Sequence, residues 1–153
     1  MYHIYTDGSC LSNGKTENKG GYGVVVVENN KILHTFRKDS VNTTNNREEM
    51  KAILAAMLWI GDKEATIYSD SAYALNTFTT WMYSWANKGW IKSDKKVPEN
   101  LDIIKVVYDI MDNGFRTNIK FVKVKGHSGD LYNEIADGLA TGDMNKVNRL
   151  IES

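Results

Sequence analysis

Four acidic residues have the types and positions needed for metal-dependent chemistry. Asp7 ends a run of strand-forming residues, and Asp70 ends a second such run. Glu49 lies in the first turn of a predicted helix, and Asp137 lies beside the apolar stripe of another. Carboxylate oxygens suit Mg²⁺ or Mn²⁺, and two such ions can hold both reacting oxygens of an in-line phosphoryl displacement. The pattern therefore predicts a metal-dependent phosphoryl-transfer site.

Each of these carboxylates also has an ordinary structural explanation. Asp7 precedes a glycine, and Asp-Gly is a common turn pair. Asp70 is placed to cap a following helix, and Glu48 and Glu49 both favour a helix N-terminus. Asp137 is placed for a solvated helix face. All four explanations would have to hold together, so a convergent site is the stronger hypothesis.

The elements that must position these residues follow a mixed α/β order. Strands are predicted at about 2–7, 21–28, 31–38, 65–70 and 118–124. Helices are predicted at about 46–60, 72–88, 100–112 and 131–141. Asn29-Asn30 forms a hairpin turn, and Asn45 or Asn46 caps the first helix. If the first and fourth strands are adjacent and parallel, Asp7 and Asp70 meet at the sheet edge where α/β folds bind ligands.

Composition limits the class of protein. The chain has 153 residues, 42% of them hydrophobic and 25% charged, which fits a single domain over residues 1–153. The longest mostly apolar run, 52–60, is too short to span a bilayer, so we expect no membrane partner. Cys10 is the only cysteine, which favours a reducing, cytoplasmic location. Met1 directly before the first strand favours a free-standing protein, and we expect a monomer.

Charge is balanced overall but uneven along the chain. The formal net charge is zero. Residues 81–96 nevertheless hold four lysines and one acidic residue, and residues 116–127 hold four basic residues and no acidic one. Local excess of positive charge matters more than the total for binding a polyanion.

The chain resembles the type 1 ribonucleases H of the bacterial kind, because it contains a series of their motifs in the same order along the sequence. They are "TDGSC", "GGYG", "TTNNREEM", "YSDSAYAL", "WANKGW" with "DKK", and "VKGHSG" with "NEIADGLA". The resemblance implies a ribonuclease H-like fold, an α/β fold with a five-stranded mixed β-sheet and flanking helices. It also implies hydrolysis of the RNA strand of RNA–DNA hybrids by two Mg²⁺ ions, with Mn²⁺ as a substitute, leaving 5′-phosphate and 3′-hydroxyl ends.

The resemblance also assigns roles to individual residues. The catalytic metal ligands are Asp7, Glu49, Asp70 and Asp137. Glu49, and not Glu48, matches the glutamate of the family motif. His127 matches a mobile histidine, for which we expect an auxiliary role in proton transfer or product release.

Further residues resemble substrate contacts of the family. Cys10 follows Gly8-Ser9, where backbone can approach a nucleic-acid strand. Asn13, Asn45 and Asn46 resemble minor-groove contacts, and Thr44 resembles a contact to a DNA phosphate. A basic protrusion that grips the DNA strand would comprise Trp81, Trp85, Lys88, Trp90, Lys95 and Lys96. Within it we expect Trp81 and Trp85 mainly to pack their helix, and Trp90 to lie near a nucleic-acid backbone.

The sequence departs from the family pattern at three places, and two alternative functions are considered. Ala72 replaces a usual glutamine, the loop 12–21 is longer and lacks prolines, and Ala86-Asn87 stands where more basic residues are usual. One rival function is a hybrid-binding module without turnover, which the intact carboxylates argue against. Another is a DNA nuclease of the same broad fold, which "TTNNR" and "GHSG" argue against.

Overall fold

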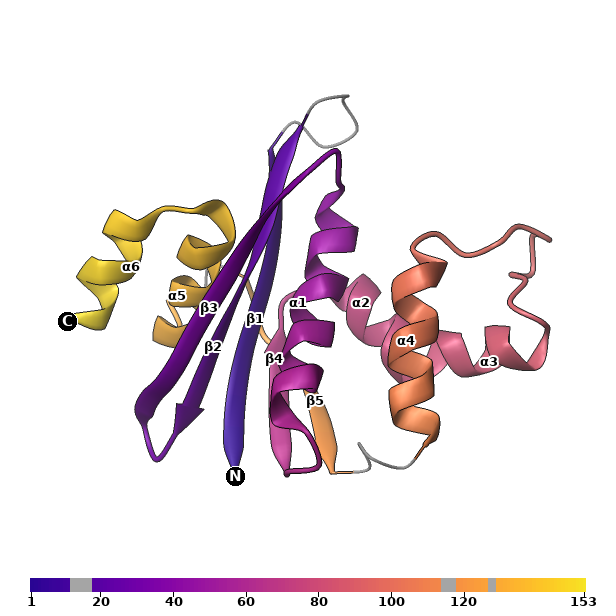
Figure 1. Ribbon diagram of the computed structural model, residues 1–153, viewed down its shortest axis with the longest axis horizontal. Coiled ribbons are helices and arrows are strands. Elements are labelled where there is room, and N and C mark those ends of the chain that lie inside the picture. The colour runs from indigo at the N-terminus through magenta and orange to yellow at the C-terminus, as the bar shows by residue number, and fades with distance from the viewer. Residues whose placement is uncertain (12–17, 114–117, 127–128) are drawn as a thin grey trace.

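A five-stranded mixed sheet forms the centre of the computed structural model, which describes residues 1–11, 18–113, 118–126 and 129–153 (Figure 1). The strands are β1 (Tyr2–Leu11), β2 (Lys19–Glu28), β3 (Lys31–Val41), β4 (Ala65–Ser69) and β5 (Ile119–Lys123). Their order is β3-β2-β1-β4-β5. β2 is antiparallel to both of its neighbours, β1 and β3, whereas β4 is parallel to both β1 and β5. The predicted fold class is confirmed.

Helices cover both faces of this sheet. They are α1 (Asn45–Ile60), α2 (Ala72–Asn76), the π-helical turn η1 (Thr77–Trp81), α3 (Met82–Asn87), α4 (Leu101–Asp112), α5 (Leu131–Thr141) and α6 (Met144–Ile151). α1 and α4 lie on one side of the sheet, and α5 and α6 lie on the other (Figure 1). None of the helices in the described part of the chain is long and apolar enough to cross a membrane.

The valine run of β2 shows how the two layers are formed. Val24 and Val26 are buried in the core beneath α1, whereas Val25 and Val27 are buried against α5. Successive side chains of a strand point to opposite faces, so a strand buried on both faces needs a continuous apolar run. The apolar stripe of α1 completes the larger core.

Several predicted boundaries are wrong. β1 continues past its predicted end through residues 8–11, and β3 continues through residues 39–41. β2 begins two residues before its predicted start, at residues 19–20. Backbone pairing continues there through stretches that include glycine, lysine, aspartate and serine, which have weak strand propensity. The N-cap of α1 is Thr44, neither Asn45 nor Asn46, because its hydroxyl accepts the Arg47 N–H at 3.1 Å.

α6 was not predicted at all. Of its eight residues, Val147 is buried in the core against α5, and Leu150 packs beside it. Met144, Val147, Leu150 and Ile151 do recur at helical spacing, so the sequence carried a short periodic signal for this helix. Asp143 caps the helix by accepting the Lys146 N–H. The predicted helix 72–88 is interrupted by the π-helical turn η1.

Candidate active site

Three carboxylates meet where β1 and β4 run side by side. Tyr5 of β1 is paired in parallel with Tyr68 of β4, so Asp7 and Asp70, each two residues later, reach the same level of the sheet. Glu49 joins them from the first part of α1. Carboxylate oxygens of all three residues lie within 4.8 Å of one another. The sheet edge therefore carries the predicted acidic cluster.

Gly8 allows α1 to approach β1 closely enough to place Glu49. A Cβ atom on Gly8 would lie 2.2 Å from the Glu49 backbone nitrogen and 2.4 Å from the Glu48 carbonyl carbon. Only glycine fits such a contact between two backbones. The Gly8 N–H also donates a hydrogen bond to Glu49 Oε1, which fixes this carboxylate beside Asp7.

Asp137 reaches the same cleft from α5, on the other side of the sheet. It lines a cleft of about 240 Å³ together with Asp7, Glu49 and Asp70. Its Oδ2 accepts a hydrogen bond from Lys146 Nζ at 2.8 Å, and this ammonium also contacts Glu134 Oε2 at 2.9 Å. Sequence reasoning missed Lys146 because its helix, α6, was not predicted.

The buried acidic cluster shifts the protonation of its members. Burial, followed by the negative charge of Asp70, raises the pKa of Asp7 to about 8. Burial, with the charges of Asp7 and Asp70, also raises the pKa of Glu49 well above its usual value. Carboxylates that share a desolvated site resist ionising together. A cation placed among them would offset this repulsion.

The ordinary structural explanations of Asp7 and Asp70 do not fit the structure. Asp7 lies inside β1, paired with Gly23, and is not in a turn. The N-cap of α2 is Ser71, whose hydroxyl accepts the Ala74 N–H at 3.1 Å, so Asp70 does not cap that helix.

Glu48 has a structural role that the sequence did not reveal. Its side chain is fully buried, and its carboxylate accepts hydrogen bonds from Thr43 Oγ1 at 2.6 Å and Ser40 Oγ at 2.9 Å. Lys51 Nζ lies 3.1 Å from the same carboxylate. Glu48 thus ties the segment before α1 to the helix and faces away from the acidic cluster.

Replacing Glu48 with alanine should lower the free energy of unfolding by about 2–4 kcal/mol, because a buried charged hydrogen-bond network loses its central acceptor. It should also raise KM for the substrate, because the segment that carries Thr44 loosens. Urea unfolding and steady-state kinetics measure the two effects. Glu48→Gln should recover much of the stability, and exposed Glu64→Ala serves as the control. An unchanged unfolding midpoint in Glu48→Ala would contradict this role.

Three residues that were predicted to contact the nucleic acid, at its minor groove or at a DNA phosphate, lie at the start of α1. Thr44, Asn45 and Asn46 are all exposed, and Asn45 lines the acidic cleft. Asn18 supports this segment from below: it accepts the Thr43 N–H and donates to the Thr43 carbonyl, both at 2.8 Å. A single asparagine in a polar loop carries no sequence signal for such a role.

Cys10 lies on the extended part of β1, next to the same segment. It is partly exposed, and its Sγ lies 3.5 Å from the Thr43 carbonyl oxygen. Two other predicted site residues, Asn13 and His127, fall outside the described residues.

The basic protrusion contains a partly aromatic groove of about 410 Å³ lined by Tyr73, Trp81, Trp85 and Lys92. Trp85 packs against the main core, as expected. Trp81 also packs within this helical segment, with its ring centroid 6.1 Å from that of Trp85, although 38% of it remains exposed. It stands edge-on to Tyr73, with ring centroids 5.8 Å apart.

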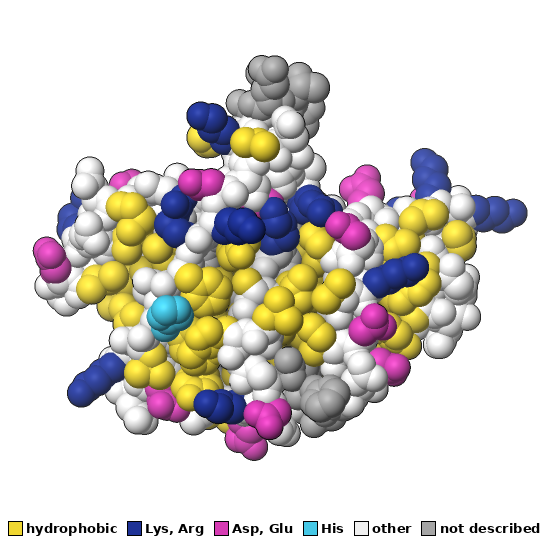
Figure 2. All heavy atoms as spheres, in the orientation of Figure 1, with side chains coloured by type: hydrophobic (Ala, Val, Ile, Leu, Met, Phe, Trp, Pro, Cys, Tyr) yellow, Lys and Arg dark blue, Asp and Glu magenta, His cyan; other side chains and the backbone are white. Residues whose placement is uncertain are grey.

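The rest of the protrusion separates into an inner tryptophan and outer lysines. Trp90 is half-buried and packs edge-on against Tyr108 of α4, with ring centroids 5.2 Å apart. Lys88, Lys95 and Lys96 are exposed. Figure 2 shows Lys and Arg side chains projecting at the end of the molecule where α3 and the segment after it lie.

Comparison with known proteins identifies similar chains. The RNase H family model matches residues 1–145. A ribonuclease H of Thermoanaerobacter sp. (strain X514) is 35% identical over 153 residues, covering 97% of this chain and 93% of the relative.

Solved structures share the fold. A type 1 RNase H with the type 2 active-site motif superposes with a TM-score of 0.72 at 28% identity, over 94% of this chain and 72% of the other. A foamy viral protease-reverse transcriptase in complex with an RNA/DNA hybrid superposes with a TM-score of 0.81 at 21% identity. That match covers 92% of this chain and only 19% of the viral protein.

Proposed function

Because the chain belongs to the ribonuclease H family, we propose that it hydrolyses the RNA strand of RNA–DNA hybrids with two divalent ions at its acidic cleft. The observation that carries this proposal is the convergence of Asp7, Glu49 and Asp70 within 4.8 Å, with Asp137 in the same cleft. Ionising all four carboxyl groups in one cleft is unfavourable, and the pKa values of Asp7 and Glu49 are raised for this reason. A bound cation or a proton would offset the charge.

The donor set fits Mg²⁺, with Mn²⁺ as a substitute, because every side-chain ligand offered is a hard carboxylate oxygen. Asp7, Glu49, Asp70 and Asp137 would hold the ions. When bound, divalent ions supply charge stabilisation and activate water in phosphoryl transfer. We expect products with 5′-phosphate and 3′-hydroxyl ends.

The chain's own residues hold these ligands in place. Asp7 lies within β1 and Asp70 directly follows the last residue of β4, so the sheet sets the positions of both. Glu49 is fixed by the Gly8 N–H, and Asp137 by the Lys146 ammonium. Each ligand is thus oriented before any ion arrives.

Substrate binding is proposed at two places, the start of α1 and the basic protrusion. Thr44, Asn45 and Asn46, with Cys10 beside them, would contact the hybrid at the start of α1. The protrusion with Trp81, Trp85, Trp90, Lys88, Lys95 and Lys96 would grip the DNA strand. Asn13 is retained as a further contact. His127 is retained as an auxiliary catalytic residue, in a single domain acting as a monomer.

Incubation with a hybrid labelled on either strand tests this function. Mg²⁺ should permit cleavage of the RNA strand alone, and EDTA should prevent it. The RNA fragments should be extendable from their 3′ ends by a polymerase, which requires a 3′-hydroxyl. Binding without cleavage would favour a hybrid-binding module, and cleavage of the DNA strand would favour a DNA nuclease.

A further inference from the structure

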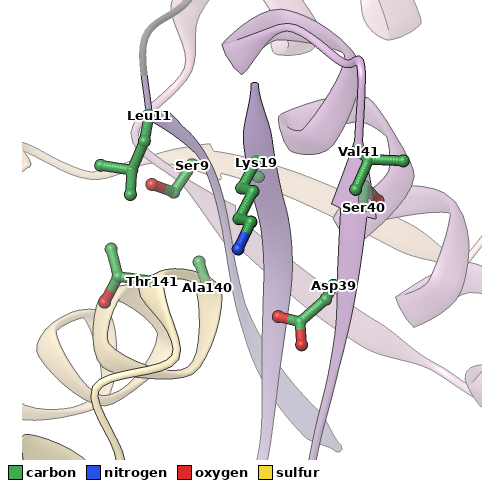
Figure 3. A pocket seen from close by; sticks show the side chains of 9 residues that line it. Ser9, Leu11, Lys19, Asp39, Ser40, Val41, Ala140 and Thr141 are labelled. Atoms are coloured by element: carbon green, nitrogen blue, oxygen red, sulfur yellow. The ribbon is translucent and has the colours of Figure 1, made fainter. Parts of the chain in front are cut away.

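A second groove lies on the sheet face that carries α5. It has a volume of about 330 Å³ and lies between the extended ends of β1, β2 and β3 and the C-terminal end of α5 (Figure 3). The side chains that matter here are Ser9, Leu11, Lys19, Asp39, Val41 and Thr141.

Strand register shows that this groove continues directly from the acidic cleft. On this face, Asp7 is paired with Gly23, the next row is Ser9 with Gly21 and Asp39, and the last row is Leu11 with Lys19 and Val41. Ser9 lines both the cleft and the groove. Thr141 lies four residues after Asp137, one turn along α5. A polymer bound at the carboxylates can therefore pass into the groove.

Lys19 gives the groove a positive charge. Its exposed side chain points from β2 into the groove, between Thr141 and Asp39 (Figure 3). Asp39 is paired with Arg37 Nη2. Among the residues that the structure describes, no carboxylate forms an ion pair with Lys19. Its ammonium is thus available to an anion that enters the groove.

Thr141 adds a hydrogen-bond acceptor. Its hydroxyl lies 3.1 Å from the Asp137 carbonyl oxygen and 3.3 Å from that of Gly138, to which it donates its proton. The lone pairs of Thr141 Oγ1 then suit a donor such as a ribose 2′-hydroxyl, and do not suit a phosphate oxygen. Leu11 and Val41, each 68% exposed, offer apolar surface beside these groups.

We propose that this groove is a binding subsite for the RNA strand of the hybrid, holding a nucleotide close to the cleavage point. Lys19 contacts a phosphate, and Thr141 accepts a hydrogen bond from a 2′-hydroxyl. RNA, not DNA, is the occupant because the groove extends from the carboxylates that act on the RNA strand and offers an acceptor for its distinguishing hydroxyl. This inference rests on the function proposed above.

Lys19→Ala tests the phosphate contact, with Lys38→Ala as its matched control. Lys38 is an exposed lysine on the neighbouring strand, but it shares its face with Phe36, which packs against the opposite core. Both variants lose one positive charge. Lys19→Ala should weaken hybrid binding about three- to tenfold and reduce the salt slope by roughly one unit, whereas Lys38→Ala should change neither. Binding is measured in Ca²⁺ across a salt series.

Thr141→Val, with single 2′-deoxy substitutions along the RNA strand, tests the hydroxyl contact. In the wild type, one position near the cut should show weaker binding when its 2′-hydroxyl is removed, by about two- to tenfold. That penalty should disappear in Thr141→Val. Equal effects of Lys19→Ala and Lys38→Ala, or a 2′-deoxy penalty unchanged by Thr141→Val, would overturn the subsite.

The same preparations separate failure of the subsite from failure of the proposed function. Wild-type cleavage of the hybrid in Mg²⁺ is measured first. If the wild type does not cleave the RNA strand, the function itself is wrong and the subsite falls with it. If it cleaves normally while the variant contrasts are absent, only the subsite is wrong.

Discussion

Asp70→Asn should abolish hybrid cleavage, with a fall in rate of at least about 10³-fold. The substitution keeps the shape of the side chain but removes one of the three carboxyl groups whose oxygens lie within 4.8 Å of one another. An amide also offers only one oxygen where a carboxylate offers two. Single-turnover cleavage of a labelled hybrid at saturating Mg²⁺ measures the effect without interference from product release.

Asp62→Asn is the matched control for this prediction. Asp62 is exposed and lies in the turn after α1, away from the acidic cleft. Its replacement removes the same charge and should leave the rate within about twofold of wild type, as surface substitutions usually do. Substantial cleavage by Asp70→Asn would show that this residue is not a ligand.

Gly8→Ala should both destabilise the protein and inactivate it. The new Cβ would overlap backbone atoms of Glu48 and Glu49, the nearest at 2.2 Å, so β1 and α1 must separate. Overpacking against rigid backbone should lower the free energy of unfolding by about 3 kcal/mol or more. Because Glu49 moves with the helix, the rate per folded molecule should fall at least about 10²-fold. Urea unfolding and single-turnover kinetics measure the two effects.

Gly61→Ala is the control, because it introduces backbone strain but no steric overlap of the new Cβ with other atoms. Gly61 has a φ of +67°, but its Cβ would meet nothing within 4 Å. Alanine there should cost about 1–3 kcal/mol from strain and leave the rate per folded molecule unchanged. A stable, fully active Gly8→Ala variant would show that the contact between β1 and α1 does not position Glu49.

The sequence predicted the parts of the site that depend on strand order and periodicity. Asp7 and Asp70 follow strand-forming runs, and parallel neighbours place such residues at one edge. The hairpin turn at Asn29-Asn30 is confirmed, with φ values of 54° and 61° at its two residues. Asparagine tolerates this left-handed conformation, so the two residues of the turn were enough to predict it from the sequence.

The rest depended on tertiary contacts that leave no periodic pattern. Glu48 looked like an ordinary first-turn acidic residue, and its burial became visible only once β3 was placed against α1. Lys146 reaches Asp137 across two helices that touch only in the folded protein. Lys19 faces a groove because β2 extends further than its strand propensity indicates.

Metal-free protein should lose stability as pH rises through the acidic and neutral range. The pKa of Asp7 is raised to about 8 in the folded state by burial and the charge of Asp70. Below about pH 4 both states hold the proton, so the cluster costs nothing. Between about pH 4 and 8 the unfolded state loses the proton while the folded state keeps it, so stability falls. The raised pKa of Glu49 acts in the same direction.

Thermal melts of wild type and Asp70→Asn, in EDTA and in Mg²⁺ at pH 5 and 8, test the shared acidic cluster most directly. In EDTA at pH 8, Asp70→Asn should be more stable than wild type by on the order of 1 kcal/mol or more, because one repelling charge is gone. That advantage should shrink at pH 5, and Mg²⁺ should stabilise the wild type more than the variant. A metal-free variant less stable than wild type at pH 8, with an equal response to Mg²⁺, would contradict a single metal-binding cluster.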